Sequence, residues 1–337
     1  MTPRLALAAV LVLGTFASSA RADSSVSVAL DQNGQALASQ LGFTPDQLAA
    51  AIQDKIDSLY RISGIDGLLQ AIGDTGSFSQ RGLGVDYDPD DRDITFGVSV
   101  AGVHGNVAIG TSDSLLGGSI ADYAVMAGVN LGRWGQPRWT VFANGGYETT
   151  TIHGVTGDLS TGGIHAQYRV VGSRGDANAR WSGVFITSGI ELAKWTMNAV
   201  EPIESHVIVT GPGGTKSIHM SSSGLLTVDS HVTTIPLEVT TAVRLGRHFE
   251  LFGGAGLDIA LGHTTAAMQL TSQLTVNNTN DPVGTAQIAA SGAHDPRTIT
   301  TFAIGGLGLH TRHVRVTVHT AVSSDELLFG LALRGAI

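Results

Sequence analysis

Side-chain alternation is the feature of this sequence that most constrains its fold. Between Asp93 and Ile337 the chain repeats, about ten times, a run of roughly 10 to 16 residues in which every second side chain is apolar. In the run 235–245 the odd-numbered residues are mostly Ile, Leu and Val, whereas the even-numbered ones include Glu238 and Arg244. Because successive side chains of a strand point to opposite faces, each run predicts a strand with one apolar and one polar face.

The length of these runs indicates what the apolar face meets. Strands of soluble proteins are usually about 5 to 6 residues long. A strand of about 13 residues rises roughly 43 Å, or roughly 30 Å after a tilt of about 45°, which is enough to cross an apolar band about 25 Å tall. The sequence therefore predicts an all-β fold, a closed antiparallel transmembrane β-barrel with a short N-terminal helical segment. A secreted, water-soluble β-rich protein is the alternative, because alternation does not distinguish lipid from a protein layer.

Composition agrees with this fold class and excludes several others. The chain has 337 residues with 44 Gly and no Cys, so neither a disulfide framework nor thiol chemistry is available. Outside its first residues it contains no apolar stretch long enough for a transmembrane helix. Its 19 basic residues against 28 acidic ones argue against nucleic acid as a partner.

Connections between the runs predict the number of strands. Short connections alternate with long ones, the long ones lying near 104–118, 152–162, 198–230 and 263–297. The ten predicted strands are 93–103, 119–132, 138–151, 163–172, 181–197, 231–246, 248–262, 298–310, 313–322 and 326–337. Twelve strands are the alternative. The extra strands would come from a hairpin strand at Gly82–Asp88, or from pairing of Ser205–Thr210 with Thr215–Met220 across a Gly-Pro-Gly-Gly turn.

The first 22 residues have the features of a signal peptide. Arg4 supplies a positive charge, 5–16 form a short apolar stretch, and Ala20-Arg21-Ala22 is a small-x-small cleavage site. An N-terminal membrane anchor is the alternative, although this apolar stretch is too short to span. We therefore expect residues 1–22 to be removed on export.

Residues 23–80 differ from the rest of the chain. Thr44 to Gln47 form a capping box with Pro45 at the first helical position. A helix is predicted over about 45–63, followed by a short second one over 65–72, because apolar residues recur there at helical spacing. This segment either caps the barrel on its periplasmic side or plugs its lumen, and residues 81–337 form the barrel.

With this pattern the chain resembles Gram-negative outer-membrane β-barrel proteins, over roughly residues 93 to 337. The resemblance includes the last strand, where Leu327, Phe329, Leu331, Leu333 and Ile337 alternate up to the final residue. It implies an outer-membrane location in a Gram-negative bacterium, with outer-membrane lipids and the barrel-assembly machinery as partners. It also implies short periplasmic turns and longer extracellular loops.

The polar face of the strands supplies the candidate functional residues. Those predicted to line the lumen are Asp122, Glu148, His165, Arg169, Glu191, Glu238, Arg244, Asp258, Arg315, His319 and Arg334. Acids and arginines are interleaved among them. They form either a buried ion-pair network that fills a narrow barrel or a polar pathway that selects small solutes. No cofactor, metal site or catalytic residue is predicted.

These observations favour a small channel or a structural surface protein. Enzymes are an alternative class: His219 and Ser221 have the spacing of a lipid A-modifying pair, and Asp229 with His231 that of a barrel protease. A surface adhesin is a third class, since the segments 198–230 and 263–297 are long, polar and low in charge.

Overall fold

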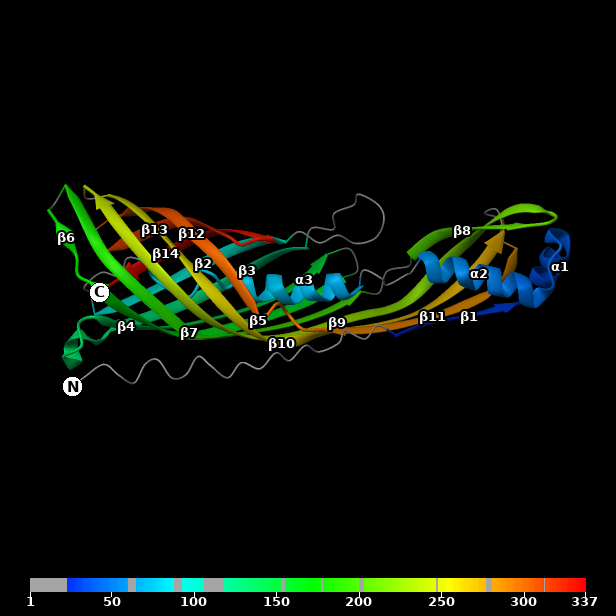
Figure 1. Cartoon of the computed structure of the whole chain (residues 1–337), viewed down its shortest axis with the longest axis horizontal. Coiled ribbons are helices and arrows are strands. Elements are labelled where there is room, and N and C mark those ends of the chain that lie inside the picture. Colours follow the sequence, from blue (N-terminus) through cyan, green and yellow to red (C-terminus); the bar gives the residue numbers. More distant parts are fainter. Residues whose placement is uncertain are drawn as a thin grey trace.

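The computed structural model describes residues 23–59, 65–87, 93–105, 118–152, 155–176, 178–199, 203–246, 248–276, 281–311 and 313–337. The signal peptide predicted over residues 1–22 lies outside the described residues. The molecule is elongated, with a ring of strands at one end and a smaller group of strands and helices at the other (Figure 1).

Ten antiparallel strands form the ring, and the pairing of β9 with β10 closes it. They are β2 (Ile94–Gly105), β3 (Gly118–Asn130), β4 (Trp139–Ile152), β5 (Val155–Val171), β7 (Ala179–Ala199), β9 (Gly214–Leu245), β10 (Phe249–Val276), β12 (Ile299–His310), β13 (Val314–Val322) and β14 (Glu326–Ala336). The predicted barrel of ten strands is confirmed, and each strand overlaps one of the predicted ranges.

The two faces of the ring differ as the alternation predicts. Every strand of the ring carries at least one large apolar or aromatic side chain exposed on its outer face, such as Phe96, Val125 and Leu237. The inner face is lined by Gly, Ala, a few aromatic side chains and buried polar groups. The hydrophobic surface of the ring therefore points outward, which is the reverse of a soluble barrel.

At one end of the ring the connections are short; we call it the short-turn end. It holds the 3-10 helix η1 (Leu131–Trp134), the short β6 (Arg174–Gly175) that pairs with β7, and the C-terminus. There the backbone N–H of Ile94 donates to the carbonyl oxygen of Ile337 at 3.2 Å. The first and last strands of the ring, β2 and β14, thus pair at the end that the C-terminus occupies.

Beyond the other end of the ring, β9 and β10 continue as a pair. Their outer parts, 214–230 and 264–276, join β8 (Ile203–Gly211), β11 (Pro282–His294) and β1 (Asp23–Leu30) in a sheet of order β1-β11-β10-β9-β8. The helices α1 (Gln32–Leu41) and α2 (Pro45–Leu59) cover one face of this sheet. We call these elements the lobe (Figure 1, right).

Local sequence explains the two helices of the lobe. The side chain of Asp31 accepts a hydrogen bond from the backbone N–H of Gly34 and caps α1, which ends at Gly42 in the left-handed conformation, with φ 75°. The predicted capping box forms at α2, where the Thr44 N–H donates to Gln47 Oε1 at 2.9 Å. Leu48, Ile52 and Ile56 then line one stripe of α2, buried against the sheet.

A third helix, α3 (Ile65–Phe78), leads the chain from the lobe into the ring. It contacts β2, β3, β7, β9, β10 and β14, so ring strands lie on several sides of it. Residues 73–87 are all buried. We call residues 65–87 the plug: they enter at the lobe end, and the chain resumes at Asp93 at the short-turn end.

Some sequence-based expectations are corrected. Residues 82–87 form no strand and instead lie in the lumen. The pairing of 205–210 with 215–220 forms in the predicted register, but in the lobe, so it does not raise the ring to twelve. The predicted long loops near 152–162, 198–230 and 263–297 are largely strand. β4 and β5 pair with each other as far as Ile152 and Val155, and β9 and β10 extend beyond the ring, where β8 pairs with β9 and β11 pairs with β10.

Candidate functional site

The centre of the lumen is an arginine of the plug surrounded by acids of the wall. Arg81, only 1% exposed, hydrogen-bonds Glu191 of β7. Its Nε lies 3.0 Å from Asp258 Oδ2 on β10, and its Nη1 lies 3.6 Å from Glu238 Oε1 on β9. A guanidinium has five N–H donors in a planar fork, so it can reach carboxylates on three strands at once. The wall thus forms an acidic socket for one cation of the plug.

A second cluster has the opposite polarity. Asp86 of the plug accepts two hydrogen bonds from Arg315 of β13, at 2.7 and 3.0 Å. Arg334 of β14 donates to the carbonyl oxygens of Gly82 and Val85, at 3.1 and 2.6 Å. The basic side of the wall therefore holds the acidic residue of the plug, while the acidic side holds Arg81.

Neutral contacts complete the fit between plug and wall. The Ser79 hydroxyl donates to Asp122 Oδ2 at 3.1 Å, and Gln167 Nε2 donates to the backbone oxygen of Asp86 at 3.1 Å. Tyr87 stacks on Phe252, with ring centroids 5.0 Å apart. These contacts lie within residues 79–87, so the fit of this part of the plug to the wall does not rest on ion pairs alone.

Burying these charges is tolerable only because they are paired. An ion in a low-dielectric interior costs several kcal/mol, and removing one partner of a buried pair costs about 3–5 kcal/mol. The plug and the wall are therefore electrostatically interdependent. If the plug left the lumen, the charged side chains of the wall would remain without their partners.

Most of the sequence-predicted lumen residues gather around the plug. Buried side chains are those of Asp122, His165, Glu191, Glu238, Asp258, Arg315, His319 and Arg334. Glu148, Arg169 and Arg244 are half-buried, and the Arg169 guanidinium lies 5.3 Å from the Phe185 ring centroid. The sequence set omitted Arg81 and Asp86. Their only sequence signal is two charges in a Gly-rich stretch directly after a predicted helix.

The two enzyme candidates lie on exposed sheet surface. Glu204 accepts a hydrogen bond from the Ser221 hydroxyl at 2.7 Å and lies 2.8 Å from His219 Nε2. The serine is thus bonded to the acid and not to the imidazole, whereas a nucleophilic relay needs a serine-to-base bond. Asp229 and His231 form a 2.7 Å pair, each side chain 45% exposed. Neither arrangement assembles a nucleophile, a base and an enclosed pocket.

Within the described ranges, no group of three or more His, Asp or Glu side chains is arranged to hold a metal ion. None of the described helices is long and apolar enough to cross a membrane.

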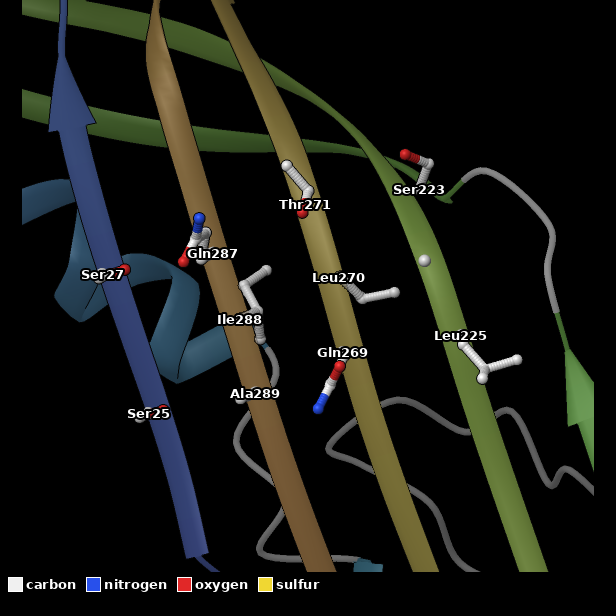
Figure 2. Close-up of a pocket in the computed structure, with 11 residues that line it drawn as sticks. Ser25, Ser27, Ser223, Leu225, Gln269, Leu270, Thr271, Gln287, Ile288 and Ala289 are labelled. Carbon is white, nitrogen blue, oxygen red and sulfur yellow. The ribbon is translucent and has the colours of Figure 1, made fainter.

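One area of the uncovered face of the lobe sheet carries neutral polar side chains. A depression of about 740 Å³ on it is bordered by the hydroxyls and amides of Ser25, Ser27, Ser223, Gln269, Thr271 and Gln287, with Leu225 beside them (Figure 2). These side chains come from four adjacent strands and lie in cross-strand rows, such as Ser27, Gln287, Thr271 and Ser223. The opposite face is the one that α1 and α2 cover.

Comparison with known proteins gives a family and several distant structural likenesses. A family model described as Lsa36-like matches residues 7–334. No curated protein matches the sequence.

Similar solved structures include the translocator domain of the autotransporter NalP from Neisseria meningitidis, at 10% identity and a TM-score of 0.30, covering 85% of this chain and 99% of that one. Ail, the attachment invasion locus protein of Yersinia pestis, solved with a heparin analogue, has 8% identity and a TM-score of 0.26, covering 72% of this chain and 96% of that one. The Pseudomonas putida toluene transporter TodX has 7% identity and a TM-score of 0.24, covering 78% of this chain and 91% of that one. At TM-scores this low, nothing about ligand or activity carries over.

Proposed function

For this chain, which belongs to the Lsa36-like family, we propose a role as an outer-membrane barrel whose lumen is closed by its own plug. The barrel anchors the chain in the membrane, and the lobe projects from it as a surface structure. In this orientation the short-turn end faces the periplasm and the lobe faces outward, following the usual disposition of turns and loops in such barrels. Outer-membrane lipids surround the ring, and the barrel-assembly machinery inserts it.

The observation that carries this proposal is the occupation of the lumen by residues 73–87, all of them buried. A ring of about eight strands has an interior just wide enough for side chains to fill, and a ring of ten is wider. Here a peptide segment occupies that space, held by charge pairs on both sides. A small channel is therefore the less favoured of the two functions predicted from the sequence.

Conductance of the purified protein in planar bilayers tests the plug. We expect the wild type to show no stable ion-conducting state. The double variant Arg81→Ala/Asp86→Ala removes both charged anchors and leaves charged wall residues unpaired, so we expect the plug to leave the lumen and conductance steps to appear.

A matched control exists at the short-turn end. Arg133 and Asp93 form an ion pair 2.5 Å apart whose side chains are 70% and 37% exposed. The double variant Arg133→Ala/Asp93→Ala likewise removes one positive and one negative charge, but from an exposed site, so its lumen should stay closed. A conducting wild type, or equal behaviour of the two double variants, would contradict the proposal.

Surface contact is a second candidate function, favoured by the lobe. Its uncovered face presents neutral hydrogen-bonding groups around the depression, including the side-chain amides of Gln269 and Gln287. Gln269→Ala/Gln287→Ala should weaken adhesion of cells displaying the protein to a ligand-coated surface. Substituting exposed residues of α2, such as Lys55, should not. Equal adhesion of all variants would exclude this face.

A further inference from the structure

The outer face of β9 and β10 changes character at one level of the structure. From the short-turn end upward, its residues are apolar, except for Thr241, as far as Leu261 on β10 and the level of Ile235 on β9. Above that level the same face carries His231 and His263, and then the hydroxyls and amides of the lobe. Since the two strands are continuous, only their surroundings can account for the change. It marks the upper limit of the hydrocarbon layer in the proposed orientation.

A row of polar side chains crosses five strands at this limit. Its members are cross-strand neighbours in sequence of pairing, and we call them the boundary row: Tyr147, Ser160, Lys194, His231 and His263. Tyr147 is 72% exposed, as expected for an aromatic side chain at a membrane–water interface.

Immediately below, on the membrane side, lies a second row formed by Gly162, Leu192, Thr233 and Leu261. Leu192 and Leu261 are both exposed. The two rows together border a depression of about 550 Å³, in which Thr233 lies between the two larger leucine side chains. An apolar floor and a polar, cationic upper edge therefore meet in one hollow on the outer surface of the ring.

We infer that this hollow binds a phosphorylated lipid, with the phosphate against Lys194, His263 and Ser160 and an acyl chain along Leu192 and Leu261. The inference rests on the proposed placement of the ring in a membrane. Lys194 is exposed, and within the described residues it has no carboxylate partner. A phosphate group at the same level would supply the opposite charge that the described residues do not.

The carboxylates nearest the row do not compete for Lys194. Asp229 is paired with His231 at 2.7 Å. Asp158 accepts hydrogen bonds from the Thr149 hydroxyl at 2.7 Å and the Tyr147 hydroxyl at 3.4 Å. Both acids lie one row nearer the lobe than Lys194, away from the apolar floor. The membrane side of the lysine is thus left to a lipid headgroup.

Native mass spectrometry of the protein in dodecyl maltoside micelles, which contain no phosphate, tests the inference. The probes are dioleoyl phosphatidic acid, the corresponding diacylglycerol without phosphate, and inorganic phosphate. We expect phosphatidic acid to bind and Lys194→Gln to weaken its binding about tenfold or more, because a charge-assisted contact is lost. Lys55→Gln, which removes an exposed lysine from α2 in the lobe, should leave binding unchanged.

Each other outcome overturns the inference. Equal weakening by Lys194→Gln and Lys55→Gln would show that the boundary row is not the site. Equal binding of diacylglycerol would show that the phosphate is not recognised. Displacement of phosphatidic acid by an equal concentration of inorganic phosphate would show that the acyl chain does not contribute to binding. The folded, heat-modifiable band of the same micellar samples reports on the barrel itself, so failure of the lipid site is distinguishable from failure of the proposed function.

Discussion

Replacing Val239 by arginine should destabilise the protein in a bilayer far more than the same charge placed on the lobe. Val239 lies on the outer face of β9, 48% exposed, six residues from Leu245 at one rim and eight from His231 at the other. With about 3.4 Å per residue and a tilt of about 45°, it lies roughly 14 Å and 19 Å from the two rims. An arginine near the midplane of a barrel costs about 2–4 kcal/mol.

Thr271→Arg is the matched control, because Thr271 is exposed on the same outer face of the continuous β9–β10 pair but lies in the lobe. We expect it to change the free energy of unfolding by no more than about 0.5 kcal/mol. Urea unfolding in phospholipid vesicles, followed by the fluorescence of the four tryptophans, among them Trp139 and Trp181 in the ring strands, measures both variants. Equal destabilisation by the two arginines would refute the assignment of the outer face to lipid.

Three further predictions concern the plug, the lobe and one loop. Gly82→Ala should loosen the plug by about 1–2 kcal/mol, because Gly82 has φ 80° and a Cβ there would overlap a lumenal imidazole; limited proteolysis of the plug would show it. Asp31→Ala removes the cap of α1 and should cost the lobe about 1 kcal/mol, seen as faster amide exchange in α1. Hydrogen bonds from Ser324 and Arg297 lower the pKa of Asp325. The stabilisation that ionised Asp325 gives the folded protein is therefore present above the ordinary aspartate pKa, and it is lost as the pH falls through the lowered pKa of Asp325. Because Arg297→Ala removes one of these hydrogen bonds, it should raise the pKa of Asp325 in an NMR titration.

The ring was predictable because each of its strands meets the same two environments over the whole part that lies in the ring. One face contacts the surroundings of the barrel and the other its interior, so the alternation in 235–245 or 326–337 is a local consequence that can be read without knowing any partner. The helix α2 was predictable for a similar reason, since its capping box and apolar stripe lie within a few residues of each other. The outer parts of β9 and β10 were predicted as loops, because beyond the ring no apolar surroundings impose alternation on their outer face.

The sequence by itself therefore determined where the strands of the ring lie and which side chains of each face outward, because these depend on neighbours two to four residues apart. Only the tertiary structure decided that the ring is occupied. Arg81 meets acids that lie more than 100 residues away in the chain, and Asp86 meets Arg315 from the far side of the ring. Such pairings exist only once the ring has closed around the plug, because closure brings distant strands to one point and excludes the water that would otherwise screen their charges.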